Sequence, residues 1–462
     1  MNVTLIVLVI YLALMFAIAW YFSRKESLES YFLNKKQTGL WLMTFSTVAT
    51  VIGAGATVAI VSEVYNSGIS YGLAIPISFG LGMIILGLMA KKIKQVGDEY
   101  NAHTIVDFFH NRFDTKNKIL TGILQIFLLI IWIGVQAIAI ASLASVLVGI
   151  DYTLALFLTA AITILYTAIG GLKIDIITDF IQFWIIFIMF AIMAIIGYSQ
   201  VGGISNLLSQ LPAGHLNPFA FGGITWFVGV ILLSGFLYLG NTAHWQRIFS
   251  VKNQKIARKS FFLTIPFLII FGVLILFIGL VAAVLLSGIK QDTAIFSLMT
   301  SILPPWLIGI GFAAILAVIM SSIDSLLVGG STIIYQAFFT GKISDSRKQV
   351  FYARLITGLF GLCGFFIAFM VPNIITLSIF VVYMALLFVP PILAGLYSKK
   401  ISSNASFYSI LIPIIVLFSL YSIVGKNTFM ITTPLGILII LFYDKIFKKK
   451  SQTPLEMVGF EE

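Results

Sequence analysis

The 462-residue sequence is 60% hydrophobic and only 10% charged, a balance that soluble globular domains do not have. Its net charge of +11 does not indicate nucleic-acid binding, because the basic residues lie in short stretches between apolar runs. The single cysteine, Cys363, and four scattered histidines exclude a disulfide framework and a zinc cluster. No nucleophile–base pair or cofactor motif indicates an enzyme. The sequence therefore predicts an all-α polytopic membrane protein.

Apolar runs long enough to cross a bilayer follow one another along the chain. A helix needs about 20 mostly apolar residues to cross the hydrocarbon core. The sequence contains about thirteen such runs. The predicted spans are 2–22, 42–65, 71–92, 119–149, 152–170, 175–198, 222–246, 260–288, 304–338, 350–371, 373–397, 403–424 and 428–447.

The basic residues predict which side of the membrane each loop faces. No basic residue precedes the first span, and Arg24 and Lys25 follow it, so we expect an uncleaved span with an outer N-terminus. With that orientation, only Lys290 and Lys426 of the 28 lysines and arginines lie outside. An odd number of spans then places the C-terminal tail in the cytoplasm. The sequence predicts a multi-pass protein of the cell membrane whose basic tail carries Lys445, Lys448, Lys449 and Lys450.

Two spans contain residues that favour a break in the helix. Gly53 and Gly55 lie in the second span, and Gly240 lies in the seventh. Glycines make an unwound segment less costly, and its freed carbonyls can then face a ligand. These spans open two five-span blocks, 42–198 and 222–397, and matching interruptions in two halves indicate a transporter site. Close packing of helices through small residues is the alternative.

The span 304–338 contains the most polar turn of the membrane-embedded sequence. Ser321, Ser322, Asp324 and Ser325 lie within an otherwise apolar stretch. A charged residue at membrane depth costs about 2.5–3.5 kcal/mol on insertion scales, so such a residue is usually paired or functional. Hydroxyls and carboxylates are ligands for small hard cations. The alternative is that the serines bond to carbonyls one turn earlier in their own helix.

Further motifs resemble the sodium/solute symporter family, which transports sugars, proline, pantothenate, sialic acid and other small solutes. The resemblance covers about residues 1–400, and the motifs occur in the family's order together with the serine-rich span. The motifs are YTAIGGLKIDIITDFIQ from Tyr166 to Gln182, NTAHWQRIFSVKNQKIARKS over 241–260, and Tyr65, Gly68, Tyr71 and Gly72 after the second span.

The resemblance implies a LeuT-type inverted repeat of five plus five helices, with one extra helix before and two after. The first helix of each repeat would be broken at mid-membrane, where the solute binds. One chain holds a full set of spans, so a monomer suffices. The implied divisions are 1–41 for the extra helix and inner loop, 42–199 and 222–397 for the repeats, and 398–462 for the last two helices and the cytoplasmic tail.

The resemblance also implies sodium as the coupling ion. Neutral oxygens suit a monovalent ion, and an ion that ties two helices together can bias outward-open against inward-open states. The implied sodium ligands are the carbonyls of Ala49, Ile52 and Val318 and the hydroxyls of Ser321 and Ser322.

A second sodium site is implied at Asp179, Ser321, Asp324 and Ser325. For Asp179 the alternative is an interfacial acid that caps a helix or pairs with Lys173 or Arg247. Asp175, one turn earlier, is expected to be a surface acid.

The implied substrate positions are Ala56, Gln136, Asn241, Thr242 and Tyr383. The hexose carriers of the family have glutamines where Ala56 and Tyr383 stand, so an amino acid or carboxylate is favoured over a hexose. We therefore expect a sodium-coupled secondary active symporter of a small organic solute, which works in the lipid bilayer by alternating access. A proton-coupled symporter, through Asp179 and Asp324, or a passive facilitator are the alternatives.

Overall fold

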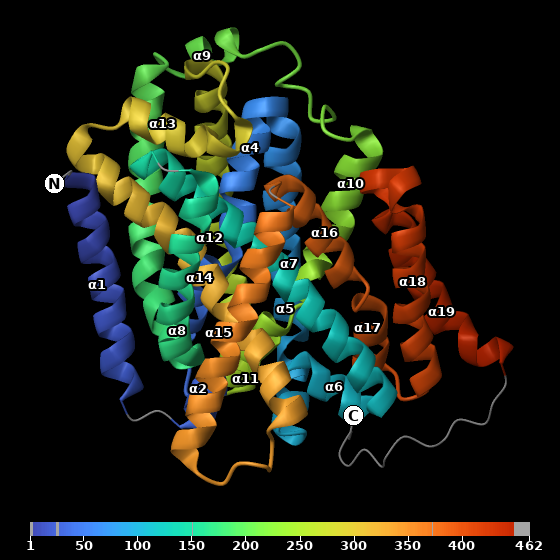
Figure 1. Cartoon of the computed structure of the whole chain (residues 1–462). Coiled ribbons are helices and arrows are strands. Elements are labelled where there is room, and N and C mark those ends of the chain that lie inside the picture. Colours follow the sequence, from blue (N-terminus) through green and yellow to red (C-terminus); the bar gives the residue numbers. More distant parts are fainter. Residues whose placement is uncertain (1–2, 25–26, 150, 372, 448–462) are drawn as a thin grey trace.

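The apolar runs of the sequence form helices in the computed structural model, which describes residues 3–24, 27–149, 151–371 and 373–447 (Figure 1). Ten helices in this part of the chain are long and apolar enough to cross a membrane. Two further helix pairs pass the same test together and are bent at a short break. The predicted all-α membrane fold is therefore confirmed.

One helix accounts for two of the predicted spans. The helix α8 (Tyr152–Gln200) has 49 residues, about 73 Å at 1.5 Å per residue, more than twice the thickness of a bilayer core. It is interrupted at Gly171, whose φ of 61° and ψ of 178° are not helical. A Cβ at Gly171 would also lie 2.6 Å from the ring of Tyr31, so glycine is needed there. With this division the observed number of spans agrees with the predicted number of about thirteen.

The helices follow the predicted order along the chain. The spans are α1 (Val3–Ser23), the bent pair α3 (Leu40–Val51) and α4 (Val58–Ser67), α5 (Ile69–Glu99), α7 (Thr115–Val148), α8, the bent pair α10 (Gly223–Leu233) and α11 (Thr242–Ser250), α12 (Gln254–Leu285), α14 (Pro305–Phe338), α15 (Ser346–Met370), α16 (Ile374–Leu386) with α17 (Val389–Tyr397), α18 (Ser403–Val424) and α19 (Phe429–Ile446). Shorter helices are α2 (Leu28–Leu33), α6 (Ile105–Arg112), α9 (Ile204–Gln210) and α13 (Ala294–Ile302), with 3-10 turns η1 (Asn34–Lys36), η2 (Ala54–Ala56), η3 (Ser234–Tyr238), η4 (Gln291–Thr293) and η5 (Gly425–Asn427).

The helix α14 forms the centre of the bundle. In its most apolar 18-residue stretch 83% of the residues are buried, against 17% in α1 and 28% in α18 and in α19. Figure 1 shows α1 at one edge of the molecule and α18 and α19 at the opposite edge. The single cysteine, Cys363, is exposed on α15. The serine-rich turn thus lies on the most enclosed helix of the fold.

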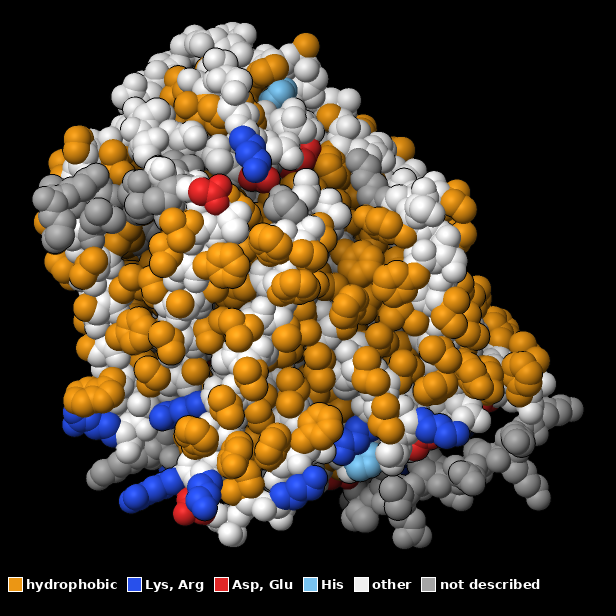
Figure 2. All heavy atoms as spheres, in the orientation of Figure 1, with side chains coloured by type: hydrophobic (Ala, Val, Ile, Leu, Met, Phe, Trp, Pro, Cys, Tyr) orange, Lys and Arg blue, Asp and Glu red, His pale blue; other side chains and the backbone are white. Residues whose placement is uncertain are grey.

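The surface is divided as a membrane protein requires. Figure 2 shows a broad apolar band, and most lysines and arginines on that face gather at the end of the molecule where Figure 1 places α2 and α6. A band of this kind meets lipid, and basic side chains lie beside it at the aqueous boundary. Lys25, Lys448, Lys449 and Lys450 lie outside the described residues.

Candidate functional site

The serine-rich turn of α14 contacts α3 directly. Residues 321–325 are at most 3% exposed. The hydroxyl of Ser321 lies 3.0 Å from the carbonyl of Val318, one turn earlier, and 3.0 Å from the carbonyl of Ala49 on α3. Ser321 therefore bonds its own helix, as the alternative from the sequence stated, and also contacts a carbonyl of another helix.

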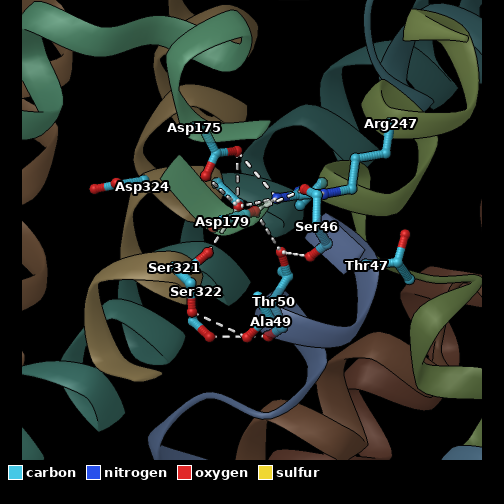
Figure 3. Close-up of polar contacts among 12 residues, drawn as sticks. Ser46, Thr47, Ala49, Thr50, Asp175, Asp179, Arg247, Ser321, Ser322 and Asp324 are labelled. Carbon is cyan, nitrogen blue, oxygen red and sulfur yellow. Dashed lines mark hydrogen bonds and ion pairs between the residues drawn. The ribbon is translucent and has the colours of Figure 1, made fainter. Parts of the chain in front are cut away.

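The break in the first bent pair lies against this turn. The helix α3 ends at Val51, and α4 continues at an angle of 70°. The hydroxyl of Ser322 donates to the carbonyl of Thr50, next to the break, at 2.8 Å (Figure 3). Gly53 is packed so closely that a Cβ would overlap the side chain of Ser322. The polar turn of α14 thus packs against the break that follows α3. The carbonyl that Ser322 bonds, that of Thr50, lies two residues before Ile52.

The oxygen atoms at this contact fit a sodium ion. The carbonyls of Ala49 and Val318 both lie within hydrogen-bond distance of the same Ser321 hydroxyl. In the described part of the chain, no group of three or more His, Cys, Asp or Glu side chains could hold a metal ion. A set of neutral oxygens without nitrogen or sulfur suits a hard monovalent cation and not a transition metal.

A cavity lies on the other side of the same break and is lined by both bent pairs. Ala56 and Gln136, two of the predicted substrate residues, line it. The side-chain carbonyl of Gln136 accepts the N–H of Ala54 at 2.9 Å. The amide nitrogen of Gln136 and the hydroxyls of Ser234 and Ser378 are buried at the cavity and have no hydrogen-bond partner in the described chain. These three polar groups are free to bind a solute.

The other predicted substrate residues lie outside this cavity. Asn241 caps α11 by accepting the N–H of Ala243 at 2.9 Å, and the Thr242 hydroxyl accepts the N–H of Ile105 at 3.3 Å. Tyr383 stacks on Phe429, with ring centroids 5.4 Å apart, beside a smaller neighbouring cavity. The structure thus brings Ala56 and Gln136 together and uses Asn241 and Thr242 in its own backbone contacts.

A buried charge cluster lies next to the serine turn, and Figure 3 shows its side chains pointing toward one another. Arg247 on α11 is fully buried, and its Nη2 is 3.0 Å from Asp175 Oδ2 and 2.9 Å from Asp179 Oδ2. The Ser46 hydroxyl donates to Asp179 Oδ2 at 2.6 Å. The expectation that Asp175 is a surface acid is wrong: its side chain is 1% exposed because it faces Arg247 in the bundle.

Asp324 lines the same small cavity as Asp175 but bonds a different partner. It accepts a hydrogen bond from the Thr167 hydroxyl at 2.5 Å, and in Figure 3 its side chain points away from Asp179. Asp179 and Ser325 instead share the guanidinium of Arg247, which is 2.6 Å from the Ser325 hydroxyl. The four residues assigned to a second sodium ion therefore bond different partners: Asp179 and Ser325 bond Arg247, Ser321 bonds Ala49, and Asp324 bonds Thr167.

Several polar residues of the site carry only a weak sequence signal. Ser46 and Thr50 lie four residues apart, on one face of α3, and both donate to Asp179 Oδ2, at 2.6 and 3.4 Å. That spacing in an apolar run could have indicated them. Ser234 and Ser378 are single hydroxyls in apolar helices, and nothing in their surroundings in the sequence distinguishes them from serines that bond their own helix.

The fold and the site together define a secondary membrane transporter: many spans, two of them broken, meet at a buried set of oxygens and an enclosed cavity. The model of the sodium:solute symporter family matches residues 31–413. The chain belongs to this family and is a sodium-coupled symporter of a small organic solute, with Na⁺ as the coupling ion, and not an enzyme.

Relatives with known roles support this membership. The chain is 28% identical over 469 residues to the sodium/pantothenate symporter of Haemophilus influenzae, covering 96% of this chain and 93% of the relative. It is 28% identical to the osmoregulated proline transporter OpuE of Bacillus subtilis, with 77% and 75% of the two chains covered. The structure of a sodium-coupled sialic acid symporter has the same fold, with a TM-score of 0.83 at 20% identity over 96% of this chain and 98% of the other.

Proposed function

We propose that the chain moves its solute by alternating access, with one sodium ion held between α3 and α14. The proposed ligands are the predicted carbonyls of Ala49, Ile52 and Val318 and the hydroxyls of Ser321 and Ser322. The observation that carries this proposal is that Ser321 and Ser322 both bond to carbonyls at the end of α3. An ion there ties the two helices together and so stabilises one arrangement of them over another.

The same unwound segment links the ion to the solute. Thr50 and Gly53 line the cavity, and the next residue, Ala54, bonds Gln136. Binding of either ligand orders residues that the other also contacts. This shared ordering is a coupling free energy, and it acts equally in both directions.

The cavity favours a small carboxylate or amino acid over a hexose. Its described lining contains no acidic or basic side chain, and its buried polar groups without a partner are one amide nitrogen and two hydroxyls, beside the polar atoms of Tyr71, Tyr238 and Trp132. These groups are enough to bind one carboxylate, whereas a sugar requires polar partners for many hydroxyls. Relatives that transport pantothenate and proline, both of which are carboxylates, support this class.

The test is thermal unfolding of the purified protein in sodium, potassium or choline, with pantothenate, proline, sialic acid and a hexose added separately. A ligand at 100 times its dissociation constant stabilises the folded state by about 2.7 kcal/mol. We expect a sodium-specific shift that a carboxylate enlarges. An equal shift in potassium, or a solute shift that depends on pH and not on sodium, contradicts sodium coupling and favours the facilitator or the proton-coupled symporter.

The repeat boundaries and the orientation belong to the same proposal. The repeats are 42–199 and 222–397; their first helices are the two bent pairs, at 70° and 49°. For an outer N-terminus and a cytoplasmic C-terminus, exposed Ser209 lies outside and exposed Ser346 inside. In a Cys363→Ser background, a membrane-impermeant thiol reagent applied to cells should label Ser209→Cys and not Ser346→Cys. The reverse pattern contradicts the orientation.

A single chain supplies the whole site in this proposal. All the proposed sodium ligands and all the residues that line the cavity come from the one described chain. A monomer in a lipid bilayer therefore suffices. Transport by liposomes reconstituted with at most one chain each would be expected, and loss of transport at that dilution would contradict it.

A further inference from the structure

Arg247 is a cation enclosed by oxygen atoms from three other helices. Its guanidinium lies 3.0 and 2.9 Å from the carboxylates of Asp175 and Asp179 on α8 and 2.6 Å from the hydroxyl of Ser325 on α14. Its Nε donates to the hydroxyl of Ser46 on α3 at 3.1 Å. All five side chains are buried. Two carboxylates and two hydroxyls are the oxygen ligands that a small hard cation would take.

One oxygen of the cage that Ser46, Asp175, Asp179 and Ser325 form around Arg247 has no partner among the described residues. Asp179 Oδ2 accepts bonds from Arg247 and Ser46, but Asp179 Oδ1 is buried without a hydrogen-bond partner among the described residues. An unpaired carboxylate oxygen at a buried position is costly. The cage therefore retains an unused ligand atom beside its bound guanidinium.

The cage adjoins the proposed sodium site. The Ser325 hydroxyl lies 3.2 Å from the carbonyl of Ser321, and the Thr50 hydroxyl lies 3.4 Å from Asp179 Oδ2. Ser321 and Thr50 also take part in the contact between α14 and α3. A cation at each of the two positions would share one turn of α14.

We propose that the guanidinium of Arg247 is a built-in cation that takes the place of a second sodium ion, so that the chain binds one sodium ion. This inference rests on the proposed function. The four residues implied for a second sodium ion all have other partners. Asp179 and Ser325 accept hydrogen bonds from Arg247. Ser321 donates to the carbonyl of Ala49, and Asp324 accepts from Thr167. Because a guanidinium keeps its charge and is fixed to α11, it cannot be exchanged for sodium in the bulk solution.

The charge balance agrees with a single sodium ion. Arg247 leaves one net negative charge on the pair of carboxylates that it bridges. That charge lies next to a sodium site made of neutral oxygens and attracts the ion there. If the positive charge of Arg247 is removed, two carboxylates and two hydroxyls are left without a cation, and sodium should bind among them.

The experiment counts bound ²²Na⁺ per chain at saturating sodium, with the purified full-length protein. We expect one ion for the wild type and one for Arg247→Lys, which keeps the charge. We expect two for Arg247→Gln and a return to one for the double variant Arg247→Gln/Asp179→Asn. Ser322→Ala, which changes the proposed sodium site alone, should still bind no more than one ion, and half-saturation should need at least about tenfold more sodium than in the wild type.

Two results overturn the inference: two sodium ions on the wild type, or a single ion on a folded Arg247→Gln variant. If Arg247→Gln does not fold, the wild-type count decides between one ion and two. A wild type that binds no sodium contradicts the proposed function itself, and a count of two leaves sodium coupling intact while it excludes the role of Arg247.

Discussion

Gln125 and Gln136 lie three turns apart on α7, and each bonds the backbone of a different broken helix. The amide of Gln125 donates to the carbonyl of Gly240 at 2.5 Å and accepts the N–H of Thr242 at 3.3 Å. The amide of Gln136 accepts the N–H of Ala54 at 2.9 Å. Because 11 residues make about three turns of 3.6, both side chains leave the same face of α7. The helix α7 thus supplies hydrogen-bond partners to the backbone at both breaks.

Replacing either glutamine by leucine is expected to destabilise the protein. The change leaves buried backbone groups without partners, at about 1–3 kcal/mol. Gln125→Leu should lower the melting temperature without a direct loss of solute contacts, whereas Gln136→Leu should also weaken solute binding about tenfold, which corresponds to about 1.4 kcal/mol. Melting curves with and without solute separate the two effects. Gln349→Leu, which loses only a bond to nearby Ile343, is the control; an equal loss there contradicts the prediction.

Ser321→Ala and Ser322→Ala are expected to weaken sodium binding. Each removes a proposed ligand oxygen, and we expect the sodium concentration for half-maximal thermal stabilisation to rise at least about tenfold. Ser331→Ala is the matched control, since Ser331 is equally buried on α14 but bonds only Val328 of its own helix, at 3.0 Å. If Ser331→Ala has the same effect, or if neither change has any, the site is not at these serines.

Gly53→Ala is expected to disturb both ligands. The new methyl group would overlap Ser322 and lie 3.0 Å from the amide nitrogen of Gln136. Overpacking of this kind costs about 1–3 kcal/mol, and here it pushes on both proposed binding positions. Sodium and solute titrations by thermal unfolding should both move to higher concentration. Gly80→Ala, where a Cβ would have no neighbour within 4 Å, should leave both unchanged. A Gly53→Ala protein with wild-type titrations would contradict the proposal that the segment around Gly53 links the sodium site to the solute cavity.

The first turn of α15 is expected to loosen at low pH. The Asp345 carboxylate accepts the N–H groups of Arg347 and Lys348 at 2.7 and 3.0 Å, and these bonds lower its pKa. Because the folded pKa lies below the unfolded value of about 3.9, the cap is intact above that value and is lost as pH falls through the folded pKa. Protection of the Arg347 and Lys348 amides, measured by hydrogen exchange, should therefore fall below about pH 4.

Asp345→Asn provides the comparison for this turn. It keeps an acceptor at the cap but does not titrate. The protection factors of the two amides should then be independent of pH across the same range. An identical decline in both proteins would show that Asp345 is not responsible.

The fold was predictable because its signals are local. Each span is a run of apolar residues, and the break at Gly53 is marked by glycines inside such a run. The polar turn of α14 could also be located from the sequence, since Ser321, Ser322 and Ser325 stand out in their apolar helix. In the structure Ser321 and Ser322 bond carbonyls at the end of α3, and their role as sodium ligands stays a prediction.

The charge cluster could not be predicted with the same ease, because its members are far apart in the sequence. Arg247 pairs with acids 72 and 68 residues earlier. Only the fold shows that Asp175 faces inward, and a sequence that places it two residues from Lys173 suggests a surface position. The same holds for Asn241 and Thr242, whose polar atoms bond neighbouring backbone and not the cavity.

The position of Arg247 has a consequence for biosynthesis. The helix α11 has nine residues and carries this buried arginine, so it is too short and too polar to enter the lipid by itself. Its carboxylate partners on α8 are made earlier, but its hydroxyl partner Ser325 lies on α14, which the ribosome makes later. We expect α11, the second half of the seventh span, to pack into the helix bundle only after α14 has left the ribosome. In ribosome-bound chains that stop before Pro305, trypsin should cut at Arg247, and in chains that extend beyond Phe338 this cleavage should disappear.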